Sequence, residues 1–292
     1  MRVVVTGGSG QAGSEVVRSL ARAGHEVVNF DLRPPAASLE LPGEFCRVEI
    51  TDIGEVYDAL FQFRPEGVCH LAANPSPQGQ ARIDVFTNNT LSAYALMQAA
   101  GDLGVRRIVY ASSETVTGIV HGRRPQSIPF DESQRMDAPN AYALSKYLSE
   151  VMADSMVQSY PGTTFVGLRL SNVMPNDDHG REMLAERRRN PARGAFNFWS
   201  YVDARDVGSA FLAALEGDTA GNEVFLVAAT DTVIDTPLAE LIETHFPGEG
   251  LTDRIAPGHG PTASVFDTGK MERVFGWRPR HSWRDQSAQG AG

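Results

Sequence analysis

Tyr142 and Lys146 are the residues whose types and spacing most directly suggest chemistry. They stand four residues apart in YALSK (142–146), so on a helix they share one face about a turn apart. A phenol has an ordinary pKa of about 10, and a nearby ammonium lowers that pKa by stabilising the phenolate. Ser113, which ends the run YASS (110–113), could then hydrogen-bond a substrate hydroxyl or carbonyl oxygen. The three residues are a candidate catalytic group for proton transfer.

A glycine-rich turn upstream favours this interpretation over a core tyrosine beside a solvated lysine. TGGSGQAG (6–13) follows the apolar run VVV and precedes a segment with helical spacing. Its glycines permit a tight turn whose main-chain N–H groups approach a pyrophosphate at the N-terminus of the next helix. The predicted cofactor-binding residues of this turn are Gly7, Gly10, Gln11, Ala12 and Gly13.

Asp31 closes the second apolar run and bears on the choice of dinucleotide. A carboxylate at this place accepts hydrogen bonds from the adenosine ribose hydroxyls and repels a 2′-phosphate, so it favours NAD over NADP. Arg33 stands two residues on, and its guanidinium could pair with a 2′-phosphate. NAD is therefore the predicted cofactor, with NADP as the lesser alternative.

The elements that must position these residues alternate along the chain. Apolar runs typical of buried parallel strands occur at 2–6, 25–31, 45–50, 67–73, 106–113, 163–170 and 222–228. Apolar residues at helical spacing lie between them, at 11–23, 54–63, 83–103, 141–159 and 205–216. This alternation predicts an α/β fold, a Rossmann-type doubly wound parallel sheet.

The chain is expected to divide into a dinucleotide-binding domain and a small lobe. Residues 1–173 would form the Rossmann domain, and 201–228 would return to it. Residues 174–200 and 229–285 would form a small C-terminal substrate-binding lobe over the carboxyl ends of the strands, where ligands of open α/β sheets bind. The tail 286–292 (QSAQGAG) is expected to be disordered.

Composition and charge argue against several classes of partner. The 292 residues carry a formal net charge of −10, which disfavours nucleic acid and anionic membranes, because binding to phosphate is driven by clustered Lys and Arg. Cys46 and Cys69 are interpreted as reduced core residues. The chain begins directly in a strand-like run without a signal sequence, so a cytoplasmic location is expected. The histidines show no metal-ligand spacing, and no metal site is predicted.

Almost the whole chain resembles the extended short-chain dehydrogenases/reductases, specifically the NAD-dependent epimerase/dehydratase family. TGGSGQAG has the family's TGxxGxxG form, SSETVTG (112–118) resembles its SSxxVYG, and YALSK matches its YxxSK. Further matches are TDI (51–53), HLAA (70–73), NNTLSAYALMQAA (88–100), LRLSNVMP (168–175), YVDARDV (201–207) and GWRP (276–279). The combination is highly specific for fold and cofactor and poorly specific for substrate.

The resemblance implies further cofactor-binding residues, on the adenine side and around the fourth strand: Asp52, Ile53, Leu71, Ala72, Ala73 and Asn89. It also implies that Lys146 binds the nicotinamide ribose, close to Tyr142. The backbone around Asn172 and Val173 would hold the carboxamide and the substrate. Helices 83–103 and 141–159 would join two copies in a homodimer.

Three departures from the family pattern bear on the reaction. Family dehydratases carry an Asp-Glu pair directly after the catalytic Ser or Thr, but Glu114 and Thr115 stand here, so dehydration is not expected. Thr117 replaces the aromatic residue of SSxxVYG. Trp199 stands where nucleotide-sugar epimerases usually carry an arginine that clamps the pyrophosphate, and its indole would suit stacking on a sugar ring. The expected substrate-binding residues are Ser113, Glu114, Asn172 and Trp199.

A basic run in the expected lobe allows two interpretations. Arg187, Arg188, Arg189 and Arg193 could act as an anion clamp in place of the missing arginine. A solvated helix face accounts for them equally well, and is the simpler interpretation.

The expected function is NAD-dependent oxidation of a secondary alcohol on a sugar or sugar derivative, with a net sugar or sugar-acid dehydrogenase slightly favoured. The first alternative is a nucleotide-sugar epimerase, which would return the hydride to the other face. A non-catalytic dinucleotide-sensing regulator is a further alternative, which the presence of both Tyr142 and Lys146 disfavours.

Overall fold

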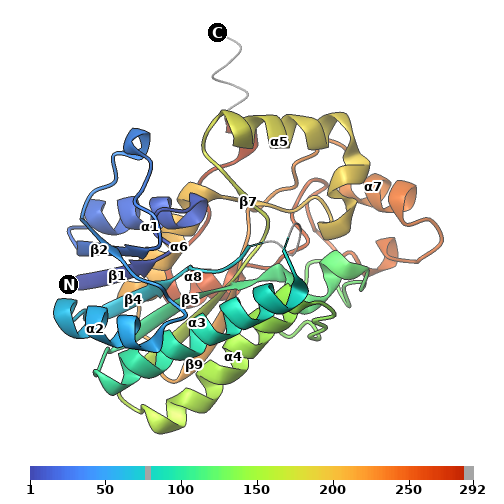
Figure 1. Cartoon of the computed structure of the whole chain (residues 1–292). Helices are drawn as coiled ribbons and strands as arrows, with labels where there is room; N and C mark the ends of the chain where they lie inside the picture. Colours follow the sequence, from blue (N-terminus) through green and yellow to red (C-terminus); the bar gives the residue numbers. More distant parts are fainter. Residues whose placement is uncertain (76–79, 286–292) are drawn as a thin grey trace.

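A parallel sheet of seven strands lies at the centre of residues 1–75 and 80–285, the part of the chain that the computed structural model describes (Figure 1). The expected disordered tail lies outside the described residues. The strand order is β3-β2-β1-β4-β5-β6-β9, and every adjacent pair is parallel. The strands are β1 (Arg2–Thr6), β2 (Glu26–Asp31), β3 (Glu44–Arg47), β4 (Gly67–His70), β5 (Arg107–Ser113), β6 (Thr164–Leu170) and β9 (Asn222–Val227). The predicted α/β doubly wound fold is confirmed.

Helices cover both faces of this sheet (Figure 1). On one face, α1 and α6 pack side by side, and on the other α2, α3 and α4 pack in sequence. Their bounds are α1 (Gln11–Arg22), α2 (Ile53–Phe63), α3 (Arg82–Asp102), α4 (Ala141–Ser159) and α6 (Ala204–Glu216). All five correspond to segments with predicted helical spacing.

The two faces explain why the strands are continuous apolar runs. Val3 and Val5 of β1 belong to the core beneath α1 and α6, whereas Val4 belongs to the core beneath α2, α3 and α4. Successive strand residues point to opposite faces, so a sheet covered on both sides needs an apolar residue at every position. β1 lies in the middle of this sheet and ends at Thr6. The glycine turn that follows it therefore lies at the carboxyl ends of the strands.

A small lobe lies next to the carboxyl ends of the strands. It contains α5 (Asp178–Arg189), the 3-10 segment η4 (Pro191–Asn197) and α7 (Leu238–His245). A two-stranded sheet, β7 (Val173–Met174) with β8 (Val202–Asp203), joins it to the Rossmann domain. Its hydrophobic core is separate from the two cores of the sheet and draws on both 174–200 and 229–266.

The helix α8 (Gly269–Phe275) departs from the expected division of the chain. Met271 and Trp277 belong to the core beneath α1 and α6, and the Phe275 ring lies 4.8 Å from the Phe225 ring of β9, centre to centre. The assignment of all of 229–285 to the lobe is therefore wrong for α8, which packs on the sheet. Sequence order alone does not reveal which of two neighbouring cores a short apolar segment joins.

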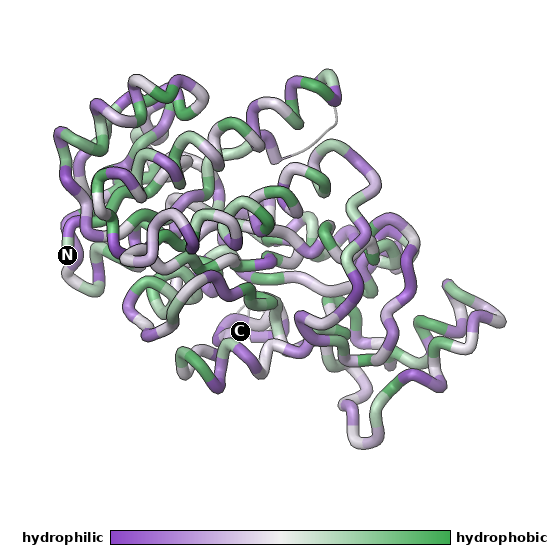
Figure 2. The backbone as a smooth tube through the Cα atoms, turned by 90° about the horizontal axis from the view of Figure 1, so that it is seen from below, coloured by the Kyte–Doolittle hydropathy of each residue, from purple (hydrophilic) through white to green (hydrophobic). Residues whose placement is uncertain are grey.

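The helices contain both hydrophilic and hydrophobic residues. In Figure 2 they alternate between hydrophilic and hydrophobic residues along their length. Within the described ranges, none is both long and apolar enough to cross a membrane.

Candidate active site

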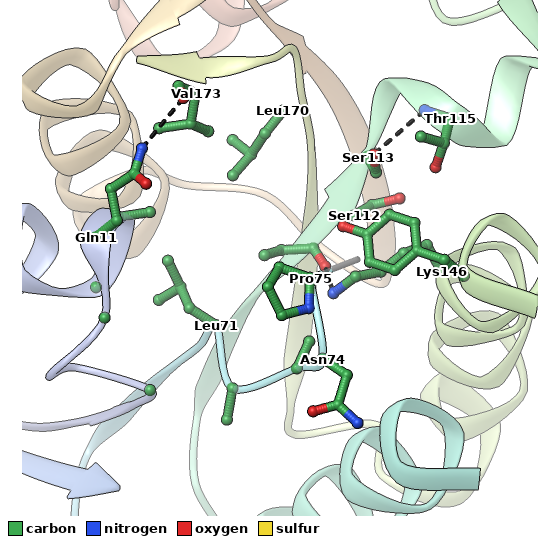
Figure 3. A pocket seen from close by; sticks show the side chains of 18 of the residues that line it. Gln11, Leu71, Asn74, Pro75, Ser112, Ser113, Thr115, Lys146, Leu170 and Val173 are labelled. Carbon is green, nitrogen blue, oxygen red and sulfur yellow. Dashed lines mark hydrogen bonds between the residues drawn. The ribbon is translucent and has the colours of Figure 1, made fainter. Parts of the chain in front are cut away.

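A cavity of about 810 Å³ opens at the carboxyl ends of the central strands, beside the lobe. Figure 3 shows Gln11 and Val173 on one side of it and Ser112, Ser113 and Lys146 on the other. The predicted site residues among its lining are Gly7, Gly10, Gln11, Ala12, Gly13, Asp31, Leu71, Ala72, Ala73, Ser113, Glu114, Tyr142, Lys146 and Asn172. The fold thus brings the glycine turn and the candidate catalytic group into one cavity. This is also the place where the strand order reverses, between β1 and β4.

The glycine turn is packed so closely that side chains would not fit. Gly7 has a φ of +71°, and a Cβ there would meet Ala72 N at 2.8 Å. A Cβ on Gly13 would meet Gly7 O at 2.1 Å. The helix α1 that follows has no side-chain cap and no acidic residue in its first turn. Its first N–H groups are therefore left for an anion, which suits the pyrophosphate of a dinucleotide.

Asp31 lies at the end of β2 and lines the same cavity. Its Oδ2 accepts a hydrogen bond from Ser9 N at 3.1 Å, which fixes the carboxylate beside the glycine turn. Ser9 Oγ in turn donates to Arg33 O, while the Arg33 side chain is exposed. The position of the Asp31 carboxylate fits one that accepts hydrogen bonds from ribose hydroxyls.

Lys146 is held against the end of β5. Its Nζ donates to Ala111 O at 2.8 Å, and the residue is only 6 % exposed. Burial lowers the pKa of Lys146 to about 8, so the amine remains mostly protonated at neutral pH. The ammonium lies 5.9 Å from the centre of the Tyr142 ring. It can therefore act on a phenolate at Tyr142 through its charge.

The pKa of Tyr142 is nevertheless raised, so the expectation that Lys146 lowers it is wrong. Burial is the largest cause, the hydrogen bond with Ser113 opposes it, and the charge of Glu114 adds to it. A buried phenolate loses its hydration, and the Lys146 ammonium donates its hydrogen bond to Ala111 O. Tyr142 is thus a phenol at rest, with Ser113 as its hydrogen-bond partner.

Buried polar pairs fix the strands that carry this group. Thr6 and His70, at the ends of β1 and β4, share a hydrogen bond of 2.7 Å between Oγ1 and Nδ1. Burial lowers the pKa of His70 to about 3, so its ring is neutral. Ser112 donates to Glu150 Oε1 at 2.5 Å, and the Glu150 carboxylate pairs with Arg169 at 2.8 Å. This buried network ties α4 to β5 and β6, and with them the spacing of the catalytic residues.

On the adenine side, the cavity is lined by residues other than those expected. The Asp52 carboxylate accepts hydrogen bonds from Gly54 N and Glu55 N as the N-cap of α2, and neither it nor Ile53 is among the described lining residues. Glu49 and Ile50, just before them, line the cavity instead. They end the predicted apolar run 45–50, so the rule that ligands bind where parallel strands end could have found them.

Asn89 lies behind the cavity wall. It is buried, and its side chain exchanges two hydrogen bonds with the backbone of Asn74, from Asn74 N to Oδ1 at 2.7 Å and from Nδ2 to Asn74 O at 3.2 Å. Its Nδ2 also donates to Ser145 Oγ on α4. Asn89 thus holds the cavity-lining segment after β4, and its support of a cofactor remains a prediction.

Trp199 does not reach the cavity, contrary to the expectation that its indole stacks on a sugar. The residue is fully buried, and its Nε1 donates to Pro191 O at 2.7 Å. Its ring packs against Phe198, His245 and Phe246 in the core of the lobe. Burial of so large an apolar surface in the lobe outweighs exposure at a binding site.

The basic run divides into surface ion pairs and one buried arginine. Arg189 pairs with Glu182, Arg193 pairs with Glu186, and Arg188 lies 3.6 Å from Asp235. Arg187 is buried instead, over the ring of Phe196 at 5.5 Å. None of the four arginines is among the described residues that line the large cavity.

The sequence analysis did not identify three residues at the lobe end of the cavity. Phe196 of η4 lines the cavity, and Asn197 and Ser171 hydrogen-bond the carboxylate of Glu114 behind it. Ser171 stands within the matched segment LRLSNVMP (168–175), directly before Asn172, and that match could have indicated it. No motif contains Phe196 or Asn197, because their position depends on where the lobe folds back. Among the described residues no group of His, Cys, Asp and Glu side chains is arranged to hold a metal ion.

Comparison with known proteins agrees with this geometry. The model of the NAD dependent epimerase/dehydratase family matches residues 3–228, which contain the glycine turn, Ser113, Tyr142 and Lys146. The chain belongs to this family. It is accordingly an NAD-dependent enzyme of the extended short-chain dehydrogenase/reductase type, and NAD is its cofactor.

Individual relatives match the chain nearly from end to end. A UDP-glucose 4-epimerase of Mycolicibacterium smegmatis is 28% identical over 96% of this chain and 94% of its own. The structure of Thermus thermophilus UDP-glucose 4-epimerase in complex with NAD has a TM-score of 0.70, with 27% identity over 97% of this chain and 96% of that one. The Thermotoga maritima UDP-glucose 4-epimerase with UDP-glucose has a TM-score of 0.72, with 25% identity over 97% and 94%. All three of these relatives are UDP-glucose 4-epimerases.

Proposed function

We propose that this protein is an NAD-dependent epimerase that inverts a secondary alcohol of a nucleotide sugar. The observation that carries the proposal is the single cavity in which Ser113, Tyr142 and Lys146 stand between the glycine turn and the lobe. The nearly full-length similarity to UDP-glucose 4-epimerases supports this reaction over net dehydrogenation. A UDP-hexose is the first substrate to test.

The residues of the chain supply the proton chemistry. Tyr142 accepts the proton of the substrate hydroxyl, and Ser113 hydrogen-bonds the same oxygen. Lys146, fixed on Ala111 O, keeps a positive charge near the phenol while it ionises. Bound NAD supplies hydride acceptance and, for the return step, hydride donation. Epimerisation then requires that the ketone turn in the lobe end of the cavity before the hydride returns.

A second candidate is favoured by one specific observation about charge. A buried diphosphate needs charge-assisted donors, yet no arginine is found among the lining residues that the structure describes. A sugar or sugar acid without a nucleotide needs no such clamp. A sugar or sugar-acid dehydrogenase therefore stands as the second candidate.

Product analysis separates the two candidates. The protein is incubated with NAD and either UDP-hexoses or free sugars and sugar acids, and epimers are separated by chromatography while NADH absorbance is followed. An inverted UDP-hexose without accumulation of NADH supports the epimerase. NADH that accumulates with a free sugar or sugar acid, together with no binding of UDP in calorimetry, supports the dehydrogenase and overturns the first proposal.

A homodimer through α3 and α4 is a further proposal about this enzyme. Exposed apolar residues gather on the two helices, which pack against each other: Ile83, Leu91 and Tyr94 on α3, and Leu144 and Val151 on α4. Two copies of such a face could form an isologous four-helix contact. Light scattering should give twice the chain mass at micromolar concentration, and Leu91→Glu should give a monomer, whereas Phe61→Glu on exposed α2 should not. A wild-type monomer contradicts the proposal.

A further inference from the structure

Glu114 is a buried carboxyl in the active-site wall that hydride transfer does not use. It follows Ser113 directly, lines the cavity and is 4 % exposed. A carboxylate in such a place is costly unless its partners satisfy it. Burial accordingly raises the pKa of Glu114 to about 7, against the opposing effects of Ser171, Asn197 and the Arg187 charge. Its ionised and protonated forms are therefore both populated near neutral pH.

The carboxyl joins three segments that are far apart in the chain. Ser171 Oγ, just after β6, donates to Oε2 at 2.7 Å. Asn197 Nδ2, at the end of η4 in the lobe, donates to Oε1 at 3.1 Å and to Ser200 O at 2.9 Å. Both partners donate hydrogen bonds, so the arrangement suits the ionised carboxylate. Glu114 directly follows β5, and its bond with Asn197 links the end of this strand to the lobe.

Asn197, the lobe residue of this contact, is next in the chain to Phe196, which lines the cavity. The Phe196 ring lies under the guanidinium of Arg187. Arg187 is 8 % exposed, and its positive charge acts on the Glu114 carboxyl by lowering the pKa of that group. Within the described residues, Arg187 Nη1 and Asn197 Oδ1 are buried without hydrogen-bond partners. Segment 191–200 has hydrogen bonds of its own, for example from Trp199 N to Gly194 O at 2.8 Å and from Trp199 Nε1 to Pro191 O at 2.7 Å. The pair with Glu114 adds a link from this segment to the residue that follows β5.

We propose that Glu114 is a positioning residue for the lobe: its carboxylate holds Asn197, and with it Phe196, at the substrate end of the cavity. Substrate affinity is then the quantity that Glu114 controls through Asn197 and Phe196, whereas NAD affinity depends on other residues. Its charge acts separately on Tyr142, whose pKa it raises. The inference rests on the proposed hydride transfer at Tyr142, and it applies to either candidate substrate.

The first experiment compares Glu114→Gln with the wild-type holoenzyme. Loss of the charged acceptor should raise KM about tenfold, the scale of one charge-assisted hydrogen bond, with NAD affinity unchanged. The matched control is Glu249→Gln, because Glu249 of the lobe also pairs with a residue outside it, Arg124, but does not line the cavity. An unchanged KM overturns the proposal, and so does a fall in kcat at constant KM.

The pH profile of KM distinguishes positioning from a merely structural role. The ionisable groups facing Glu114 are Arg187 from α5 and Tyr142 from α4. Burial lowers the pKa of Arg187, but a guanidinium keeps its proton in proteins at neutral pH. Burial raises the pKa of Tyr142, so neither group changes charge near pH 7. Wild-type KM should therefore fall as Glu114 ionises through about pH 7, and this fall should be absent from Glu114→Gln, in which Lys146, with a pKa of about 8, still titrates. A flat wild-type profile overturns the proposal.

A second variant keeps the proposal testable if Glu114→Gln folds poorly. Asn197→Asp places a carboxylate against Glu114, so its KM should rise more at pH 8 than at pH 6, and the double variant with Glu114→Gln should lose this pH dependence. Additive effects in the double variant contradict the pairing.

Hydrogen exchange gives a readout that needs no substrate. In the NAD-loaded protein, amides of 191–200 should exchange faster in Glu114→Gln than in the wild type or in Glu249→Gln. Faster exchange without turnover of any sugar would reject the proposed reaction and keep the role of Glu114. Equal exchange in all three proteins rejects the role itself.

Discussion

The cofactor end and the lobe end of the cavity are built by different means. At the cofactor end, main-chain groups dominate: Gly7 and Gly13 pack against backbone atoms, and α1 begins with uncapped N–H groups. At the lobe end, side chains from distant segments meet, as Glu114 meets Ser171 and Asn197. A main-chain site needs a few residues at fixed spacing, whereas a side-chain site exists only once the chain has packed.

The two ends also differ in how far their side chains can change between enzymes of one family. Backbone donors recognise a pyrophosphate whatever the neighbouring side chains are, so the same turn serves many enzymes of one family. The lobe end carries the side chains that can differ between substrates, and here it contains Phe196 and a buried carboxyl. The two ends should therefore respond separately to substitution.

Loss of the tyrosine hydroxyl should have the largest effect. Tyr142→Phe should reduce turnover at least about a hundredfold, because a positioned acid/base is lost, and should leave NAD binding nearly intact. Tyr147→Phe on the same helix, which does not line the cavity, is the control. Turnover above a tenth of the wild-type value would remove Tyr142 from the mechanism.

A methyl group in the glycine turn should damage the cofactor end alone. Gly13→Ala would set a Cβ 2.1 Å from Gly7 O, and overpacking of this kind costs about 1–3 kcal/mol. NAD affinity in calorimetry should fall accordingly. Gly162→Ala, where a Cβ would meet nothing within 4 Å, should bind NAD like the wild type. Normal NAD affinity of Gly13→Ala would mean that the turn adjusts.

Removal of the Asp31 carboxylate should alter the choice of dinucleotide. Asp31→Ala loses the repulsion of a 2′-phosphate while the exposed Arg33 remains, so affinity for NADP relative to NAD should rise about tenfold. Titration with both dinucleotides measures the ratio. A wild type that already prefers NADP would contradict the assignment.

The smallest effect should be the pH dependence of stability at the lobe end. Because folding raises the pKa of Glu114 from 4.5 to about 7, the folded state binds the proton more tightly than the unfolded state. Its contribution is fully present at low pH and is lost as the pH rises through 7. Relative to Glu114→Gln, the wild type should lose about 1 kcal/mol of unfolding free energy between about pH 6 and pH 8. Denaturant unfolding at both pH values tests this, and a constant difference would contradict the raised pKa.

Long-range packing accounts for the features that were predicted wrongly. The short helices α7 and α8 were not predicted, and α8 joins the sheet instead of the lobe. Trp199 was expected at the substrate and lies in the lobe core. The pKa of Tyr142 was expected to fall, but burial raises it. Each of these depends on which surfaces cover a residue, and residue spacing does not contain that information.

The sequence by itself determined the alternation of strands and helices, the glycine turn with Asp31, and the grouping of Ser113, Tyr142 and Lys146. The strand and helix pattern, the glycine turn and the pair Tyr142 and Lys146 follow from local rules, since periodicity, turn chemistry and the pitch of a helix act over a few residues. Ser113 is far from Tyr142 in the chain, and the family resemblance implied that the two are partners. Only the tertiary structure decided that Glu49 and Ile50 line the cavity, that Trp199 is buried, and that Glu114 meets Asn197. Contacts between segments far apart in the chain form only when the cores pack, because burial of apolar surface, and not local preference, selects them.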